Sequence, residues 1–195
     1  MAKQCITEKA IAKQIAICFA LEEMLMERDY EEIFVSDLCA RAGISRRSFY
    51  RYFAGKDDVL LAILENIVQD CNMNAVNVFY PEQKLEDQLM KFFCYWQEKR
   101  SHWLVIISRN HLEALVVERF VDWILREFLR DKSIEDQTRE VILDSLEFTV
   151  TGLLANLFRW GQSGFRKTPQ EMTAHMIRVM TRPLYDNIWQ KSAQL

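Results

Sequence analysis

The chain has 195 residues, of which 50% are hydrophobic and 27% are charged, and its formal net charge is −3. This hydrophobic content supplies a sizeable core and excludes a disordered chain. Only 5 glycines and 3 prolines punctuate the sequence, which favours long helices over strands and predicts an all-α fold. Charged residues interrupt every apolar segment short of the ~20 residues that span a membrane, so we expect no membrane partner.

The five cysteines form no Cys-x-x-Cys pair, and the sequence shows no secretory signal. We therefore expect reduced thiols and a cytoplasmic protein. Most of the cysteines lie among apolar helix positions, where a thiol packs as a small hydrophobic group. Cys71 and Cys94 are the candidates for a redox role, which we rank below simple packing.

A first helix is predicted from a cap at Thr7 to about residue 28, because apolar residues recur there at helical spacing. Residues 36–53 then predict two short helices joined by a tight turn. Gly43 falls where the first of these must end, since glycine tolerates the left-handed conformation, and the Ser45 hydroxyl can cap the second. This arrangement is typical of a helix-turn-helix motif.

The second helix of the motif separates polar from aromatic side chains at about 100° per residue. Its polar arc holds Arg46, Arg47, Tyr50 and Arg51. Its aromatic arc holds Phe49, Tyr52 and Phe53. Five cations and no carboxylate lie between Arg41 and Lys56, although the whole chain is acidic, which points to a polyanion as partner. A solvated helix face is the alternative interpretation.

At these residues the chain resembles the TetR family of bacterial one-component regulators, in the version common in Firmicutes. The resemblance rests on Gly43-Ile44-Ser45, Phe49-Tyr50, Phe53 and Gly55-Lys56-Asp57-Asp58-Val59-Leu60, each at the family's spacing. The family usually has threonine where this chain has Phe34, so we expect Ser36 to replace that hydroxyl. DNA contacts are predicted from Ser36, Ser45, Arg46, Arg47, Ser48, Tyr50, Arg51 and Lys56.

The resemblance implies an N-terminal three-helix helix-turn-helix DNA-binding domain over residues 1–55. It implies a C-terminal helical domain over residues 56–195 for effector binding and dimerisation, with a helix over 56–79 linking the two. The expected protein is a homodimer that binds a near-palindromic double-stranded DNA operator. We expect a repressor that a small-molecule effector releases or modulates.

Further helices are predicted over residues 82–98, 101–109, 111–130 and 135–162. Thr168-Pro169-Gln170-Glu171 is a capping box with proline at the first helical position, which predicts a last helix to about residue 182. The helix over 135–162 is apolar nearly all round and must be buried on two faces.

One face of that helix can meet the domain core, and the other can meet a second copy of itself together with the last helix. A central helix within a monomer is the alternative. The predicted dimer interface comprises Leu146, Val150, Leu153, Leu157, Met172, Met176 and Val179.

Aromatic residues are dense in the C-terminal part, and any one of them packs in a core more often than it binds a ligand. The family resemblance nevertheless implies an effector pocket there, which we predict to be lined by Trp96, Trp103, Trp123 and Phe148. The three histidines lack zinc-ligand spacing, and neither a phosphate-binding loop nor a nucleophile elbow occurs. We therefore expect no enzyme, cofactor or metal. A pocket enzyme and a helical protein-interaction module without DNA binding stay open as alternatives.

Overall fold

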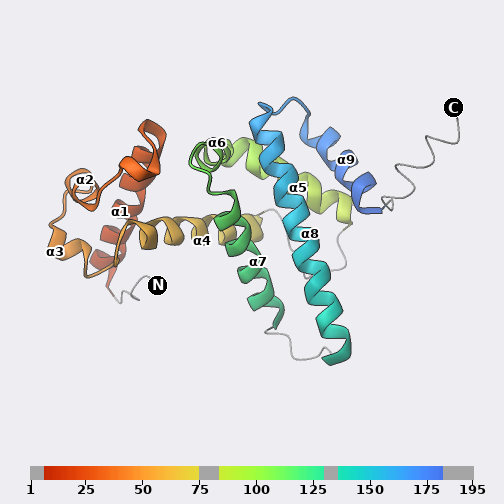
Figure 1. Cartoon of the computed structure of the whole chain (residues 1–195), viewed down its shortest axis with the longest axis horizontal. Coiled ribbons are helices and arrows are strands. Elements are labelled where there is room, and N and C mark those ends of the chain that lie inside the picture. The colour runs from red at the N-terminus through yellow and green to blue at the C-terminus, as the bar shows by residue number, and fades with distance from the viewer. Residues whose placement is uncertain (1–6, 75–83, 130–135, 182–195) are drawn as a thin grey trace, which may run out of the picture. The chain divides into compact units, whose positions relative to one another are not determined.

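The computed structural model describes residues 7–74, 84–129 and 136–181, and every regular element in these ranges is a helix. In chain order they are α1 (Glu8–Glu27), the 3₁₀ turn η1 (Tyr30–Glu32), α2 (Val35–Arg41), α3 (Arg46–Phe49), α4 (Lys56–Asn74), α5 (Leu85–Lys99), α6 (Ser101–Arg109), α7 (Glu113–Leu129), α8 (Asp136–Gln162) and α9 (Pro169–Thr181) (Figure 1). The all-α prediction is confirmed. Residues 75–79 of the predicted linking helix lie outside the described residues.

The chain forms two compact units. The first comprises Met1–Gln69 and Ile106–Arg119, and the second comprises Asp70–Val105 and Phe120–Leu195. Each of α4, α6 and α7 contributes residues to both units. The first unit therefore contains the end of α6 and the start of α7 in addition to the helix-turn-helix segment. The functional boundary after residue 55 stays a prediction.

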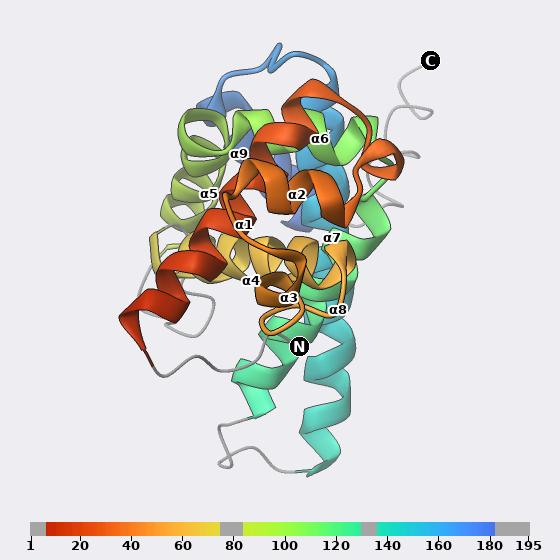
Figure 2. The ribbon, with the colours of Figure 1, turned by 90° about the vertical axis from the view of Figure 1, so that its left-hand side faces the viewer.

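The first unit has a small apolar core that holds the motif helices together. Its fully buried side chains come from α1, η1 and its flank, α2, α3 and α4: Ile17, Leu21, Leu25, Ile33, Leu38, Phe49 and Val59. Figure 2 shows α1, α2 and α3 of this unit in red to orange. Burial of this apolar area fixes the position of α3, which is too short to be stable as an isolated helix.

The turn between α2 and α3 follows the predicted geometry. Gly43 has a positive φ of 64°, its amide donates to the Ala40 carbonyl, and the Ile44 amide donates to the Cys39 carbonyl at 3.0 Å. These two bonds form a Schellman motif, which satisfies the last carbonyls of α2. Gly43 ends α2 because residues with a Cβ rarely adopt this φ.

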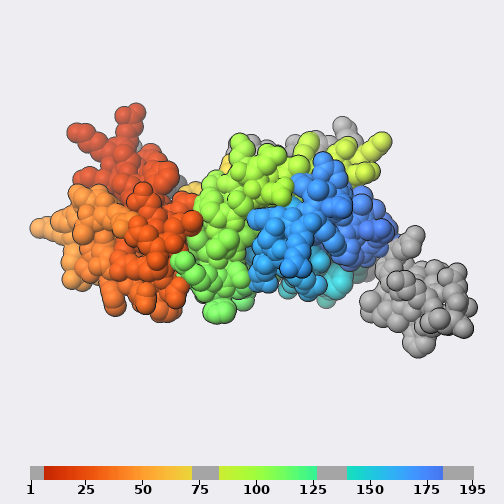
Figure 3. All heavy atoms as spheres, turned by 90° about the horizontal axis from the view of Figure 1, so that it is seen from above, coloured from red at the N-terminus to blue at the C-terminus, as the bar shows by residue number. Residues whose placement is uncertain are grey.

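The second unit is an aromatic-rich helical domain in which α9 packs on α5. Figure 3 shows the atoms of α9 (blue) against those of α5 (yellow-green). Trp96 and Trp103 are fully buried, and Trp160 packs edge-on against Phe93 and Phe165. At the start of α9, the Glu171 amide donates to Thr168 Oγ1 at 3.2 Å and the Thr168 amide donates to Glu171 Oε2 at 2.7 Å. The predicted capping box is confirmed.

Helix α8 is long and only partly covered by the rest of the described chain. Its segment Glu140–Gln162 has the length and hydropathy of a membrane span, and 22% of that window is buried. The same criteria select core helices of soluble proteins, but those are mostly buried. Four charged residues lie in the segment: Glu140, Asp144, Glu147 and Arg159. Part of the apolar surface of α8 is therefore exposed, including Val141 and Phe148.

The cysteines of the described residues are free thiols; Cys39 and Cys71 are buried, and Cys18 and Cys94 are half-buried. Burial raises the pKa of the Cys71 thiol to about 12, although the Trp96 indole opposes the shift, and burial raises the pKa of Cys18 to about 11. Burial also raises the pKa of Cys94. Because the thiolate is the reactive form, these three cysteines are poor redox sensors, which favours packing over a redox role.

Replacement of Gly43 by alanine is expected to lower the free energy of unfolding by about 1 kcal/mol, because the left-handed conformation costs about 1–2 kcal/mol per L-residue. Gly55→Ala is the matched control, since Gly55 has no positive φ and an added Cβ there meets open space. Urea titration of both variants measures the difference. Equal stability of the two variants would contradict this account of the turn.

Candidate nucleic-acid interface

Helix α3 has the face separation that its sequence predicted. Ser45 caps it, because the Ser45 Oγ accepts a hydrogen bond from the Ser48 amide at 3.2 Å. The aromatic side chains of this segment are buried: Phe49, Tyr52 and Phe53. The polar arc is exposed: Arg46, Arg47, Tyr50 and Arg51. The regular helix ends at Phe49, so Tyr50 and Arg51 lie in the turn that follows.

The three arginines of this face differ in freedom. Arg51 is held in place, because one of its Nη atoms donates to the Tyr52 hydroxyl at 2.6 Å and its guanidinium lies 4.8 Å from the centre of that ring. Among the described residues, nothing engages the guanidinium of Arg46 or Arg47 in a hydrogen bond or ion pair. These two groups are therefore available to a polyanion.

A hollow of about 640 Å³ extends this face onto α1. Residues from the helix-turn-helix line it together with Lys13 of α1: Gly43, Ile44, Ser45, Arg47, Ser48 and Arg51. No carboxylate contributes to the lining. Sequence reasoning missed Lys13, since a lone exposed lysine in a helix gives no sign of which distant residues it will join.

Two cations that the sequence placed in the basic patch have intramolecular partners. Lys56 is half-buried, its Nζ donates to the Tyr30 carbonyl at 2.8 Å, and it lies 4.2 Å from the centre of the Tyr30 ring. Arg41 donates to both carboxylate oxygens of Glu27, at 2.7 and 2.8 Å, and thereby holds the pKa of Glu27 below its usual range. The main role of Lys56 is thus to hold Tyr30 in place. Its ammonium group has further N–H donors, which a phosphate could accept.

Ser36 is exposed in the first turn of α2, where its hydroxyl is open to a ligand. It does not cap α2. Asp37 does so instead, because its Oδ2 accepts from the Phe34 amide at 3.1 Å. Arg28 lies 3.2 Å from the same carboxylate oxygen and fixes it. The carboxylate of Asp37, in the first turn of α2, therefore caps the helix in place of the hydroxyl that is missing at Phe34.

The end of α6 is hydrogen-bonded to the end of α1 within the same compact unit. The Arg109 guanidinium donates to the backbone carbonyls of Leu25 and Arg28, and its Nε lies 3.2 Å from Asp29. The Asn110 Oδ1 accepts from the Tyr30 amide at 2.6 Å. We call this set of contacts the α6 joint.

The backbone positions the residues of this joint. α6 ends in a Schellman turn, in which the Leu112 amide donates to the Ile107 carbonyl at 2.9 Å and His111 has a positive φ of 54°. The Asn110 Nδ2 donates to the Ile106 carbonyl at 2.9 Å, which orients its oxygen toward Tyr30. Both ends of each contact are thus fixed by regular structure.

The joint continues into the start of α4. The Tyr30 hydroxyl donates to Asp57 Oδ1 in a short hydrogen bond, and burial together with this carboxylate raises the pKa of Tyr30. Lys56 meets the carbonyl of the same tyrosine. Tyr30 therefore connects α6 to the helix that follows the motif, a role that no sequence pattern indicated.

The residues predicted for the pocket and the dimer interface of the second unit differ in exposure. Phe148 is 83% exposed, so it does not line an interior pocket; Trp96 and Trp103 are core side chains and Trp123 is half-buried. Of the predicted dimer stripe, Val150 and Leu157 on α8 and Met172 and Met176 on α9 are buried within their own chain, in which α9 packs on α5. Leu146 and Leu153 are half-buried, and Val179 is exposed.

Replacement of Arg109 by glutamine is expected to lower the free energy of unfolding by about 1–3 kcal/mol, because the carbonyls of Leu25 and Arg28 lose a charged donor. Arg126→Gln is the matched control, since Arg126 is exposed and bonds only within α7, to the Asp122 carbonyl at 3.1 Å. It should change stability by less than about 0.5 kcal/mol. Urea denaturation measures both, and equal losses would show that the α6 joint adds nothing.

Known proteins share this architecture. Residues 19–63 match the bacterial regulatory proteins of the tetR family. The HTH-type transcriptional regulator EthR of Mycobacterium tuberculosis is 41% identical over 61 residues, which are 31% of this chain and 28% of EthR. The HTH-type dhaKLM operon transcriptional activator DhaS of Lactococcus lactis is 29% identical over 142 residues, 72% of this chain and 67% of DhaS.

Solved structures agree in fold over most of the chain. A dihydroxyacetone kinase operon activator DhaS superposes with a TM-score of 0.52 at 19% identity, covering 87% of this chain and 94% of the other. NalD, the secondary repressor of the MexAB-OprM multidrug efflux pump in Pseudomonas aeruginosa, gives a TM-score of 0.58 at 18% identity over 89% and 96%. Residues 19–63 thus carry a helix-turn-helix similar to that of the tetR family, and the fold of the chain is shared with regulators that contain this motif.

Proposed function

We propose that this protein is a transcriptional regulator that binds a near-palindromic DNA operator as a homodimer. The exposed face of α3 carries the proposal, since the guanidinium groups of Arg46 and Arg47 have no hydrogen-bond or ion-pair partner among the described residues, and the other side of the helix is buried in the core. A recognition helix places its N-terminal residues at base edges in the major groove. A cytoplasmic location follows from this function.

The residues of this face divide into base readers and phosphate binders. Arg46 and Arg47 have free guanidinium groups, and bidentate arginine reads guanine best. Lys13 and the Tyr50 hydroxyl lie on the flanks, where they would meet the sugar-phosphate backbone. The guanidinium of Arg51 is already hydrogen-bonded to the Tyr52 hydroxyl. We therefore assign Arg51 to a phosphate, or to a base next to those that Arg46 and Arg47 contact. Ser36, Ser45, Ser48 and Lys56 supply further backbone contacts.

The dimer forms through the exposed face of α8 in this proposal. Val141, Phe148, Gly152 and Ala155 recur on that face at helical spacing, and all four are exposed. The small residues at 152 and 155 permit a second helix to approach closely. On α9, Val179 and Met180 add exposed apolar surface. A second copy would cover both helices in a two-fold four-helix arrangement.

An effector bound in the second unit would control operator affinity. It can do so only if it binds the two operator-binding states with different affinity, and a coupling of about 1–3 kcal/mol changes operator affinity about 5- to 150-fold. Repression is the expected sign, because a bound dimer blocks access to a promoter. The relative DhaS is named an activator, so a promoter fusion read with and without the regulator gene decides the sign.

Arg47→Ala is expected to relax sequence preference at one base pair of each half-site, since a bidentate contact provides about 1–3 kcal/mol of discrimination. Selection of bound duplexes from a random pool supplies the operator, and affinities for single-base variants measure the change. Arg126→Ala on α7 is the control. If the Arg47→Ala variant keeps the full sequence preference of the wild type, Arg47 does not contact a base.

Lys13→Ala is expected to weaken binding to all sequences alike. Loss of one phosphate contact should also reduce the slope of log affinity against log salt by about 0.9. Titrations of the selected operator and of an unrelated duplex at several salt concentrations give both quantities. A changed base preference with an unchanged salt slope would show that Lys13 reads bases instead.

Phe148→Glu is expected to raise the dimer dissociation constant at least tenfold, about 1.4 kcal/mol, because a two-fold interface feels each substitution twice. Val105→Glu is the matched control, since Val105 is an exposed apolar residue on α6, outside the proposed interface. Sedimentation equilibrium measures both variants. A Phe148→Glu protein that stays dimeric would place the interface elsewhere.

A further inference from the structure

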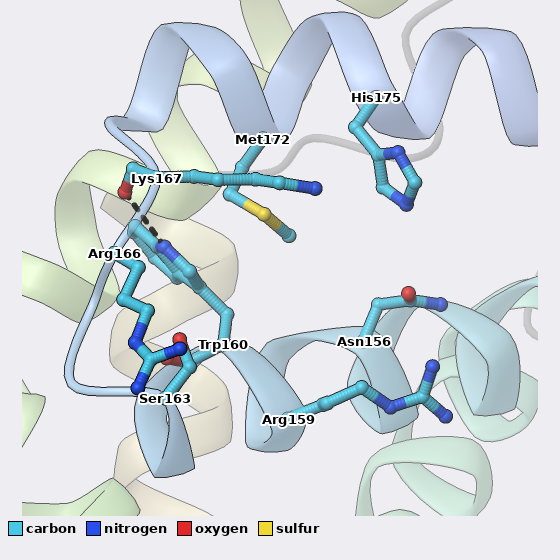
Figure 4. A pocket seen from close by; sticks show the side chains of 8 residues that line it. All are labelled: Asn156, Arg159, Trp160, Ser163, Arg166, Lys167, Met172 and His175. Carbon is cyan, nitrogen blue, oxygen red and sulfur yellow. Dashed lines mark hydrogen bonds between the residues drawn. The ribbon is translucent and has the colours of Figure 1, made fainter.

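The second unit contains a cavity of about 380 Å³ at the turn between α8 and α9. Asn156 and Arg159 of α8 form one wall, and His175 of α9 forms the other. Figure 4 shows Lys167 extending from the turn across Met172 toward the side of His175. This volume is in the range of small-molecule sites. None of the residues predicted for the effector pocket lines this cavity.

The turn that carries the cationic side chains is fixed by hydrogen bonds. The Phe165 amide donates to the Trp160 carbonyl at 3.1 Å, and Gly164 and Phe165 both have positive φ. The Trp160 indole Nε1 donates to the Lys167 carbonyl at 2.8 Å, so the side chain of α8 holds the backbone of the turn. A positive φ costs free energy in a non-glycine residue such as Phe165, and it persists where the surrounding structure enforces it. The conformation of this turn is therefore well defined.

The charged residues that line the cavity are basic, although the Glu171 carboxylate outside the lining interacts with Lys167. Arg159, Arg166 and Lys167 line it together with His175, and no carboxylate does. Among the described residues, these three permanent cations take part in no ion pair. Burial, then Lys167 and Arg178, lowers the pKa of His175 below its ordinary value. Converging like charges are unfavourable unless a counter-anion accompanies them.

The cavity also has apolar surface. The Trp160 ring and the Met172 side chain are both buried and line it. We propose that this cavity binds a small organic anion, with its carboxylate or phosphate group held by Arg159 and Lys167 and its apolar part packed against Trp160 and Met172. Arg166 lies on the other side of Trp160 and adds long-range attraction (Figure 4). The proposed anion site does not depend on the proposed DNA-binding function.

Calorimetric titration of the full chain with phenylacetate, phenyl phosphate and the neutral phenylacetamide tests the site. We expect one of the two anions to bind with a Kd below about 1 mM, and the amide to bind at least tenfold more weakly. Lys167→Gln and Arg159→Gln should each weaken anion binding at least tenfold, whereas Arg126→Gln should leave it unchanged. The bound anion should raise the His175 pKa, which NMR resolves from the other two histidines.

Several results would overturn the proposal. The first is equal affinity for phenylacetate and phenylacetamide, and the second is that neither anion binds. The third is a loss of anion affinity in the Arg126→Gln variant as large as the loss in the Lys167→Gln and Arg159→Gln variants. Unchanged secondary structure in the variants by circular dichroism excludes misfolding as the cause of a loss. If Arg159→Gln instead weakens the dimer while neither anion binds, the cations serve carboxylates of a second copy, and the ligand site is refuted.

Discussion

The hydrogen bonds that Arg109 donates to the end of α1, and the one that the Tyr30 amide donates to Asn110 Oδ1, are the contacts on which the rest of this structure depends. They bring the end of α6 into the same compact unit as the helix-turn-helix, although about 80 residues separate the partners in the chain. Charged donors on backbone carbonyls are strong and directional. The DNA-binding unit is therefore not completed by its own N-terminal segment alone.

This dependence makes α6, which contributes residues to both units, part of the support of the helix-turn-helix. α6 begins in the second unit and ends in the first, and its last residues meet Tyr30, whose hydroxyl and carbonyl engage Asp57 and Lys56 at the start of α4. α4 follows the recognition helix directly in the chain. A shift of α6 would therefore act on both sides of the motif through fixed hydrogen bonds. Coupling of this kind needs two discrete arrangements of the joint, each favoured by a different ligand.

The sequence predicted the elements well and their neighbours poorly. Gly43, Ser45 and the Thr168–Glu171 box carry local chemistry, so their turns and caps could be predicted without tertiary information. The buried face of α8 could not be predicted, because the sequence of a helix that is apolar all round does not reveal which side its own chain covers. Lys13 and Arg109 were missed for the same reason, since their partners lie far away in the sequence. The anion cavity combines ordinary exposed cations that only the turn after α8 brings together.

Amide hydrogen exchange of the full-length protein, with and without its selected operator duplex, tests the central role of the α6 joint most directly. If the joint makes α6 part of the DNA-binding unit, operator binding should slow exchange at Ser48 and Phe49 and also at Tyr30 and Leu112. Slowing confined to α2 and α3, with residues 106–119 unchanged, would contradict the account.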